Sequence, residues 1–393
     1  MGFRIRAIQP VSRVLVALTL VAAGPALAQT APDLTKQIRD SVEAWRGRLQ
    51  PTGLVVGVYR HGSVVFAEGF GVRRLGSSEP VTTRTVFHLA SVTKPFVATA
   101  VMQLVEKGKV DIDQPVTRYL PYFRIKDPRA TGITVKQLLN HTAGMPDVTD
   151  YHWGSPESDG GALERWVRGL ADSALIFQPG ERWQYSNIGF EVLADLVAKV
   201  SGEPFEDYIQ RHILTPLGMR HSTLLMTDVD SANLATGHVR PKAGEVVPSA
   251  VYPYNRRHAA SSTLHSNIED MLRWAAANVQ KGELDGHRIL STASIDRMWT
   301  VTYDMSADIA QRMARGGRTP PYQSTGIGLG WWAYQLGDRR LIGHGGGDTG
   351  FRSTILLSPA DSSAVVIMFN DERGDPSELA RTMYSILGKA SSH

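Results

Sequence analysis

The chain has no cysteine among its 393 residues. The absence of cysteine excludes disulfide bonds, a thiol nucleophile, and any metal or iron–sulfur site held by cysteine thiolates. The fold must therefore be stabilised by its core alone.

A strong excess of one charge is also absent. The formal net charge is +4, and three of the positive charges, Arg4, Arg6 and Arg13, lie in the first 28 residues, which contain no acid. Without these arginines the formal charge is +1, with both signs interspersed. The chain therefore lacks the basic footprint of a nucleic-acid-binding protein, and we expect no nucleic-acid partner.

Long apolar runs are missing as well. The longest candidate, residues 14–23, is about ten residues, whereas a membrane-spanning helix needs roughly twenty. This run follows the three arginines and precedes Ala-Leu-Ala at 26–28, the pattern of a cleaved secretory signal. We expect a signal peptide over 1–28, rather than a membrane anchor, and a cysteine-free mature protein that is periplasmic or secreted from a bacterial envelope, without stable membrane insertion.

The remainder has ordinary globular composition, with 42% hydrophobic and 20% charged residues, and shows no internal repeat or linker. Segments that resemble strands occur near both ends, and helical patterns fill the middle. Two long irregular segments, 227–262 and 303–325, are expected to rim a cleft. The strands are expected at 54–59, 64–70, 328–335, 341–343, 353–357 and 364–369, and the helices at 33–49, 134–140, 163–170, 188–200, 205–213, 267–279, 291–299 and 378–387, besides one that begins near Ser91 and stops at Gly108.

These patterns predict an α+β fold. The N-terminal hairpin and the C-terminal meander would form one antiparallel sheet flanked by the terminal helices, with a mainly helical second lobe beside it. We expect a single domain over 29–393, divided into a sheet lobe at about 33–90 and 265–393 and a helical lobe at about 91–264. The cleft between the lobes is the natural site.

A Ser-x-x-Lys motif marks the start of the central helix. Ser91 and Lys94 lie three residues apart, so both side chains project from one helix face. Such a short motif is expected roughly once by chance. The alternative is a serine that caps the helix beside a solvated lysine.

Two further motifs follow later in the chain. Tyr185-Ser186-Asn187 lies where a loop enters a helix, and either Ser186 or Asn187 could serve merely as a helix cap. His344-Gly345-Gly346-Gly347 lies among the late strands, where glycines let a substrate backbone approach a sheet edge, although a glycine-rich hairpin turn would look the same. His141, in a loop with Gly and Pro, is expected to anchor backbone hydrogen bonds rather than to act as a base.

Ser-x-x-Lys, Tyr-x-Asn and His-x-Gly in this order resemble the motif set of the class C β-lactamase-like serine hydrolases. That family includes class C β-lactamases, penicillin-binding DD-carboxypeptidases, D-aminopeptidases and esterases. The likeness covers about 35–387, including LLNHTAGMP at 138–146 and GHGGGDTGF at 343–351. It implies the β-lactamase/transpeptidase-like fold and an enzyme without metal or organic cofactor.

The resemblance also implies roles for individual residues. Ser91 would be the nucleophile, with Lys94 and Tyr185 sharing the transfer of its proton; which of the two is the base stays open. The backbone N–H groups of Ser91 and Gly347 would form an oxyanion hole. The substrate-binding residues would be Asn187, which hydrogen-bonds the substrate amide or ester, His344, which lines the far wall, and Gly345 and Gly346.

His344 stands where class C β-lactamases usually carry a lysine, and a histidine is mostly neutral at pH 7. Efficient β-lactam hydrolysis is therefore not expected. We expect an esterase-like enzyme acting on small acyl esters, with D-Ala-D-Ala carboxypeptidase or D-aminopeptidase activity second and β-lactam hydrolysis third. The alternative from another class is a non-catalytic envelope receptor for a peptidoglycan fragment. The oligomeric state is not predicted.

Overall fold

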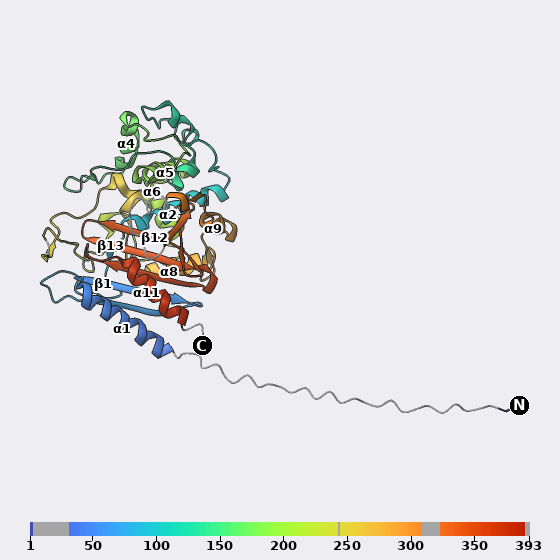
Figure 1. The fold of residues 1–393 in the computed structure, drawn as a ribbon. Helices are drawn as coiled ribbons and strands as arrows, with labels where there is room; N and C mark the ends of the chain where they lie inside the picture. The colour runs from blue at the N-terminus through green and yellow to red at the C-terminus, as the bar shows by residue number, and fades with distance from the viewer. Residues whose placement is uncertain (3–30, 243, 309–322, 390–393) are drawn as a thin grey trace.

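The computed structural model describes residues 1–2, 31–242, 244–308 and 323–389 (Figure 1). The predicted signal peptide falls almost wholly outside the described residues, as does 309–322 within the predicted loop at 303–325. Among the described residues, no helix combines the length and the apolarity needed to cross a membrane.

An eight-stranded sheet forms the centre of the fold, in the order β2-β1-β14-β13-β12-β11-β10-β9, and every pairing is antiparallel. Strands from both ends of the chain meet where Leu54 of β1 pairs with Phe369 of β14. Its strands are β1 (Gly53–Arg60), β2 (Ser63–Gly71), β9 (Tyr303–Asp304), β10 (Gln323–Ile327), β11 (Trp332–Leu336), β12 (Arg339–Asp348), β13 (Phe351–Ser358) and β14 (Ser363–Phe369). Short pairs join β3 (Phe87–His88) to β6 (His265–Ser266), β4 (His238–Val239) to β5 (Val247–Pro248), and β7 (Glu283–Leu284) to β8 (His287–Arg288).

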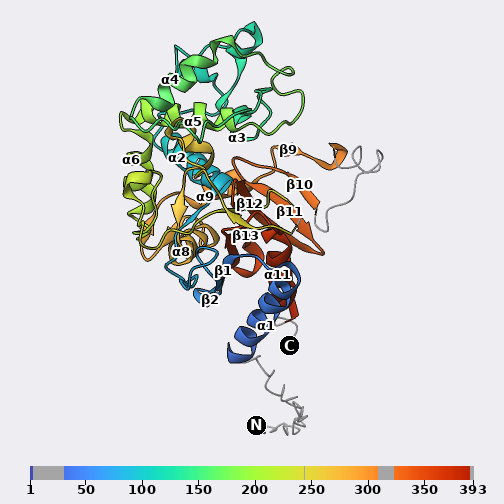
Figure 2. The ribbon, with the colours of Figure 1, turned by 90° about the vertical axis from the view of Figure 1, so that its left-hand side faces the viewer.

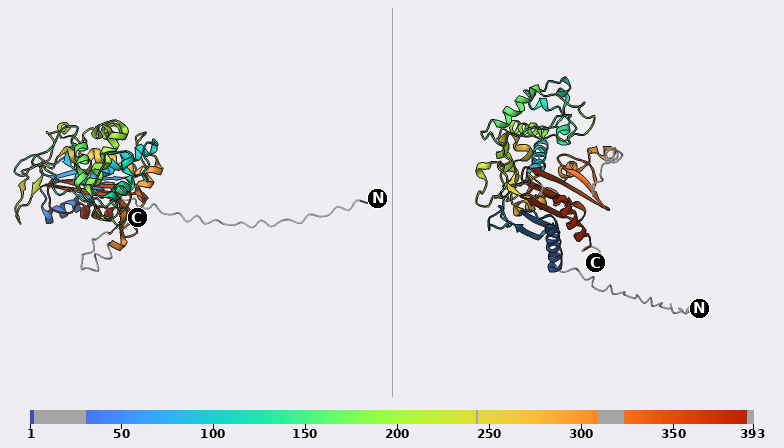
Figure 3. Two further views of the ribbon diagram at one scale, coloured as in Figure 1. Left: turned by 90° about the horizontal axis from the view of Figure 1, so that it is seen from above. Right: turned by 60° about the vertical axis from the view of Figure 1, so that its left-hand side comes forward.

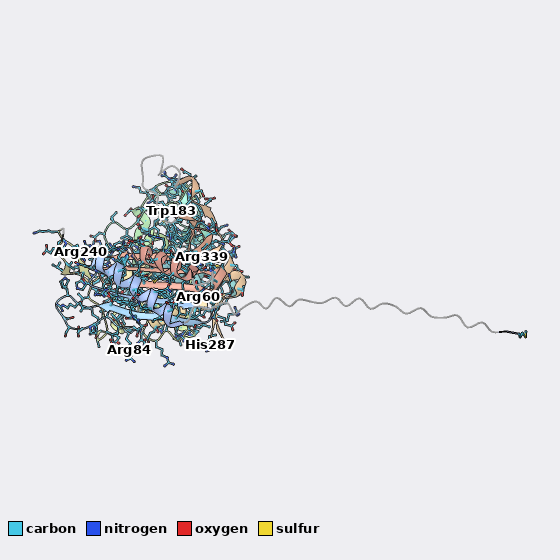
Figure 4. The ribbon with its side chains drawn as sticks, turned by 60° about the horizontal axis from the view of Figure 1, so that its bottom comes forward. Arg60, Arg84, Trp183, Arg240, His287 and Arg339 are labelled. Atoms are coloured by element: carbon cyan, nitrogen blue, oxygen red, sulfur yellow. The ribbon has the colours of Figure 1, made fainter. Side chains whose placement is uncertain are left out.

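Helices cover both faces of this sheet. α1 and α11 pack together on one face, and α8 lies on the other, below the helical part of the chain (Figures 1 and 2). The right-hand view in Figure 3 shows the same layering. The helices are α1 (Ala31–Leu49), α2 (Lys94–Glu106), α3 (Val135–Leu139), α4 (Ala162–Gly169), α5 (Asn187–Ser201), α6 (Phe205–Ile209), α7 (Ala259–Ser262), α8 (Ile268–Val279), α9 (Thr292–Trp299) and α11 (Pro376–Lys389).

β14 shows why both faces must be covered. Its apolar side chains alternate, so that Val365 and Ile367 enter the core under α1 and α11, whereas Val366 and Met368 enter the core under α8. All seven residues of the strand are buried. The predicted buried strand at 364–369 is therefore confirmed, together with the expected sheet built from both ends of the chain.

The central helix differs from its prediction at its first turn. Ser91 lies in a 3-10 turn, η1 (Ala90–Thr93), and α2 itself begins at Lys94 with Pro95 in its first turn, where proline is tolerated. Gly108 follows the helix with φ +67°, a left-handed conformation that stops it as predicted. Because α2 packs against α5, α6, α7 and α9, its apolar residues are buried on every side.

Two strand predictions need correction. The strand expected at 328–335 begins only at Trp332, because Gly330 has φ +72° and lies in the turn between β10, which ends at Ile327, and β11. The strand expected at 341–343 continues to Asp348, so the glycines after His344 lie within β12 rather than in a hairpin turn. Segment 227–262 is also less irregular than expected, since it contains β4, β5 and α7.

Candidate active site

A strained backbone turn presents Ser91. The chain leaves β3 through Leu89 and Ala90, and Ala90 has φ +48°, which is unfavourable for a residue with a Cβ atom. The turn is held from two sides, because Leu89 N–H donates to the carbonyl of Leu264 (2.9 Å) and Ser353 Oγ donates to the Leu89 carbonyl (2.6 Å). Ser91 is therefore fixed at the start of the central helix, with a partly exposed side chain.

Lys94 is fully buried and makes three hydrogen bonds. Its Nζ donates to Ser91 Oγ (3.1 Å), to Asn187 Oδ1 (2.6 Å) and to the carbonyl oxygen of Ser261 (2.9 Å). Burial lowers the pKa of Lys94 to about 8, although the charge of Glu191 opposes this shift. The solvated lysine considered as an alternative is therefore wrong, and the amine is held beside the serine hydroxyl.

Tyr185 completes the group around Ser91. Its side chain hydrogen-bonds with Ser91, and Lys94 Nζ lies 5.0 Å from the centroid of its ring. Burial raises the pKa of Tyr185 well above the ordinary value, so its hydroxyl stays protonated at neutral pH. A protonated phenol can donate to a leaving group but is not poised to remove a proton.

His141 supports Tyr185 from behind. The two ring centroids lie 4.4 Å apart, and His141 Nδ1 accepts a hydrogen bond from Ser186 N–H (3.2 Å). Burial lowers the pKa of His141 well below its usual value, and the charge of Lys94 acts in the same direction. His141 is therefore a neutral backbone anchor, and that prediction is confirmed.

Ser186 caps α5. Its Oγ accepts from Gly189 N–H (3.2 Å) and donates to the Pro146 carbonyl (2.7 Å). The capping role left open between Ser186 and Asn187 therefore belongs to the serine, and the next residue is free for another task.

The side-chain amide of Asn187 hydrogen-bonds two charged residues, Lys94 and Asp147. Oδ1 accepts from Lys94, while Nδ2 and the backbone N–H both donate to Asp147 Oδ1, at 3.0 Å and 2.8 Å. One N–H of Nδ2 is left for a substrate. The contact between Asn187 and the substrate stays a prediction. The hydrogen bond from Lys94 shows that Asn187 also orients the amine.

The glycines of β12 run close to the serine turn. A Cβ atom on Gly346 would lie 2.2 Å from the Leu89 carbonyl oxygen and 3.2 Å from Ser91 N, so only glycine fits there. Among the described residues, β11 pairs with β12 only as far as Gly343, which leaves the edge at Gly345 and Gly347 without a neighbouring strand on that side. The position of β12 beside the serine turn agrees with an oxyanion hole formed by the backbone N–H groups of Ser91 and Gly347. That oxyanion hole remains a prediction.

His344 is buried, with 2% of its surface exposed. Its Nδ1 lies 2.7 Å from the Gly345 carbonyl oxygen and must donate to it, because a carbonyl only accepts. Burial lowers the pKa of His344 to about 3, and the charge of Lys94 acts in the same direction. The ring is therefore neutral and supplies no positive charge to a substrate.

Sequence reasoning missed several supporting residues. A buried His88 contacts Asp348 (2.7 Å), which ties the strand before Ser91 to the residue after Gly347. Ser261 contributes through its backbone, which no motif reveals. Asp147, directly after the phrase at 138–146, and Glu191, one helical turn after Asn187, carry a detectable signal as acids next to recognised motifs. Among the described residues, no three His, Asp or Glu side chains are placed to hold a metal ion.

Comparisons with known proteins identify relatives of this chain. A model of the Beta-lactamase family matches residues 38–388. Protein flp of Staphylococcus aureus (strain MW2) is 26% identical over 320 residues, covering 81% of this chain and 59% of its own. Penicillin-binding protein 4 of Amycolatopsis lactamdurans is 28% identical over 303 residues, covering 76% of each chain. The chain thus spans about three fifths of the length of Protein flp.

Solved structures agree with the fold. The octameric penicillin-binding protein homologue of Pyrococcus abyssi has a TM-score of 0.77 at 26% identity, covering 90% of this chain and 77% of its own. D-amino acid amidase of Ochrobactrum anthropi SV3, complexed with L-phenylalanine amide, gives 0.75 at 21% identity over 91% and 99%. A hydrolase with promiscuous acyltransferase activity gives 0.71 at 22% over 91% and 98%. The predicted β-lactamase/transpeptidase-like fold and the predicted family resemblance are confirmed.

Proposed function

The chain is a member of the Beta-lactamase family of serine hydrolases, and we propose that it hydrolyses small acyl esters through an acyl-enzyme on Ser91. One observation carries the proposal. A buried lysine whose pKa is lowered to about 8 donates a 3.1 Å hydrogen bond to the serine hydroxyl. Such an amine is a suitable general base near neutral pH, because its neutral form is accessible there.

Acylation begins with neutral Lys94. At pH 7 about one molecule in ten carries it, given a pKa of about 8. Lys94 takes the Ser91 proton as Oγ attacks the substrate carbonyl carbon, and the N–H groups of Ser91 and Gly347 stabilise the oxyanion. The hydrogen bonds to Asn187 and Ser261 fix the amine during this transfer.

Tyr185 returns the proton. Its hydroxyl donates to the leaving alcohol oxygen as the carbonyl–oxygen bond breaks, and it regains a proton from the Lys94 ammonium. The raised pKa of Tyr185 suits a group that stays protonated between turnovers. In deacylation, water takes the place of the alcohol and passes a proton through Tyr185 to Lys94 as its oxygen attacks the acyl carbon. The Lys94 ammonium then returns the proton to Ser91 Oγ as the bond between the acyl carbon and Oγ breaks.

Electrostatics favour an acyl group without a carboxylate. His344 is neutral and buried, so it supplies no cation for the carboxylate of a β-lactam or of a C-terminal D-alanine. Nearby acids, Asp147, Glu191 and Asp348, act on Lys94 and would repel an anionic substrate. An uncharged ester meets neither obstacle.

Hydrolysis of D-amino-acid amides or peptides is the second candidate. The edge of β12 at Gly345 and Gly347 has backbone groups open to an extended substrate, which a peptide would use better than a small ester. The relatives named as penicillin-binding proteins and a D-amino acid amidase support the same alternative.

Export is a further part of the proposal, motivated by the arginines and the Ala-Leu-Ala of residues 1–28. The mature protein would act in the periplasm or outside the cell. Mass spectrometry of the protein from an expressing Gram-negative host would find an N-terminus at Gln29. An intact N-terminal Met in the cytoplasmic fraction would contradict export.

The testing experiment offers the mature protein a nitrophenyl butyrate ester, a D-Ala-D-Ala peptide and a penicillin, and follows turnover and intact mass. We expect ester turnover and a Ser91 acyl adduct that Ser91→Ala abolishes. Faster turnover of the peptide would favour the second candidate. Neither turnover nor adduct with any probe would favour the receptor alternative, and an active Ser91→Ala variant would overturn the mechanism.

A further inference from the structure

A buried polar stripe runs along α5, an otherwise apolar helix. Asn187, Glu191 and Asp195 recur every four residues, so they share one face, and their exposed fractions are 7%, 0% and 2%. Asn187 belongs to the site, whereas neither acid takes part in a proton transfer of the proposed mechanism. A carboxylate without any exposure is costly unless partners compensate it.

The partners of Glu191 lie on the segment that leads to Ser261. Oε2 accepts a hydrogen bond from Ala260 N–H (3.3 Å), and Oε1 lies 3.4 Å from Nδ1 of the fully buried His258, a contact without hydrogen-bond geometry. The His258 ring is enclosed by Tyr151 and Trp166, whose centroids lie 4.9 and 5.0 Å away. Glu191 therefore binds the residues just before Ser261.

Ser261 connects this segment to Lys94 through a backbone hydrogen bond. Its carbonyl oxygen accepts the 2.9 Å hydrogen bond from Nζ, and Ala260 N–H, one residue earlier, donates to Glu191. A shift of Glu191 would thus move one of the three acceptors of the catalytic amine. The carboxylate also faces that amine electrostatically, since its charge is the largest influence that opposes the effect of burial on Lys94.

Other ionisable groups face Lys94 from the elements around it. Asp348 on β12 and Asp147 in the loop before α4 favour its charged form. Lys94 in turn disfavours the charged forms of His141 and His344, and both rings are neutral at pH 7. Tyr185 is protonated. Glu191 differs from the other two acids because it is bound to the backbone segment that also holds Lys94.

We infer that Glu191 is a positioning residue for Lys94: its hydrogen bond from Ala260 N–H fixes the neighbouring Ser261 carbonyl, and its negative charge lies beside the amine. The inference rests on the proposed use of Lys94 as the base for Ser91. It needs no particular substrate, because it concerns only how readily the amine activates the serine.

The test therefore uses a probe of Ser91 itself. A small alkyl fluorophosphonate reacts with Oγ, forming an O–P bond and releasing fluoride, while Lys94 takes the serine proton. The labelling rate is followed by intact mass across pH 5 to 10 (roughly the range around the lysine pKa). This readout separates two failures: labelled protein that hydrolyses no ester refutes the proposed substrate alone, whereas unlabelled protein refutes Ser91 activation and this inference with it.

Glu191→Gln is the main variant, and Asp195→Asn is its matched control. Asp195 lies one turn further along α5, is equally buried, and hydrogen-bonds Tyr122 (2.7 Å) instead of facing Lys94. Removing the charge of Glu191 should lower the pKa of Lys94, so the rising limb of the labelling rate, plotted against pH, should move about one pH unit lower. The plateau that the rate reaches at high pH should fall about tenfold, because the amine is less well positioned. Asp195→Asn should change neither quantity. An unmoved limb in Glu191→Gln, or an equal shift in Asp195→Asn, would overturn the inference.

Two more variants separate charge from geometry. Glu191→Asp keeps the charge but shortens the side chain. The labelling rate should therefore rise over the same pH range as in the wild type, while its maximum at high pH falls. His258→Phe keeps the packing against Tyr151 and Trp166 but removes the ring nitrogen that faces Glu191 Oε1. The carboxylate should then move away from Lys94, and the rising limb should shift to lower pH as in Glu191→Gln. If Glu191→Gln does not fold, as judged by circular dichroism, an unmoved limb in His258→Phe overturns the inference.

Discussion

The side-chain amide of Asn187 joins Lys94 to Asp147: Oδ1 accepts from Lys94 Nζ at 2.6 Å, and Nδ2 donates to Asp147 Oδ1 at 3.0 Å. Lys94, which hydrogen-bonds Ser91, is thereby linked to the loop between α3 and α4 that contains Asp147. Because each hydrogen bond is directional, Asp147 contributes to the orientation of Lys94, the proposed base.

Asp147→Ala should lower kcat/KM for a nitrophenyl ester about tenfold, because Asn187 loses the acceptor of two N–H groups. Asp147→Asn retains an acceptor oxygen and should lose less. Steady-state kinetics of both variants checks this. Equal losses would mean that the charge matters rather than the hydrogen bonds, and wild-type kinetics in Asp147→Ala would contradict the link.

Replacing the amine should be far more damaging. Lys94→Met fills the same space without a base, and we expect kcat to fall about a thousandfold with little change in KM. Lys199→Met serves as control, because Lys199 is partly exposed and pairs with Glu164 (2.5 Å). Retention of more than about a tenth of kcat in Lys94→Met would point to Tyr185 as the base.

The pH dependence should carry the signature of Lys94. Its neutral form is the active one, so kcat/KM should rise tenfold per pH unit below about 8 and level off above it. The raised pKa of Tyr185 means that no further rise from phenolate formation should follow near pH 10. A limb near the ordinary histidine value instead would conflict with the lowered pKa values of His141 and His344.

Two neighbouring glycines should respond very differently to alanine. Gly346→Ala places a Cβ atom 2.2 Å from the Leu89 carbonyl oxygen and 2.4 Å from Ser353 Oγ, so β12 must move away from the serine turn. We expect a loss of about 1–3 kcal/mol in the free energy of unfolding and a large loss of activity. In Gly345→Ala the nearest atom is 3.9 Å away, and its stability should stay within about 0.5 kcal/mol of wild type. Denaturant titration of both variants measures the difference, and similar stabilities would refute the close packing.

The sequence predicted those features that repeat or that follow local rules. Alternation at 364–369 and helical spacing after Lys94 identified β14 and α2, because burial of one face imposes a period. The serine turn was not predictable in this way: Ala90 adopts φ +48° because Leu264 and Ser353 hold Leu89, and both are distant in sequence. The strand through the glycines of β12 was likewise hidden, since glycine favours turns and only pairing with β13 overrides that preference.

The site was predicted as far as side-chain motifs reach. Ser91, Lys94 and Tyr185 come together as their order in the chain suggested. Sequence could not reveal the Ser261 carbonyl, because a backbone atom has no motif, nor the depth at which His344 is buried. Both depend on how segments that are distant in sequence pack together.

The pairing of β1 with β14 also governs how the molecule can form. The two strands lie side by side in the interior of the sheet, yet they come from opposite ends of the chain. A nascent chain that lacks β14 cannot join β1 to β13, and the gap would leave backbone N–H and C=O groups along one edge of each strand unpaired. Closure must await the synthesis of β14, so folding should be slow and dependent on contacts between residues that are distant in sequence. Truncation before Ser363 should therefore yield an aggregating chain rather than a smaller enzyme.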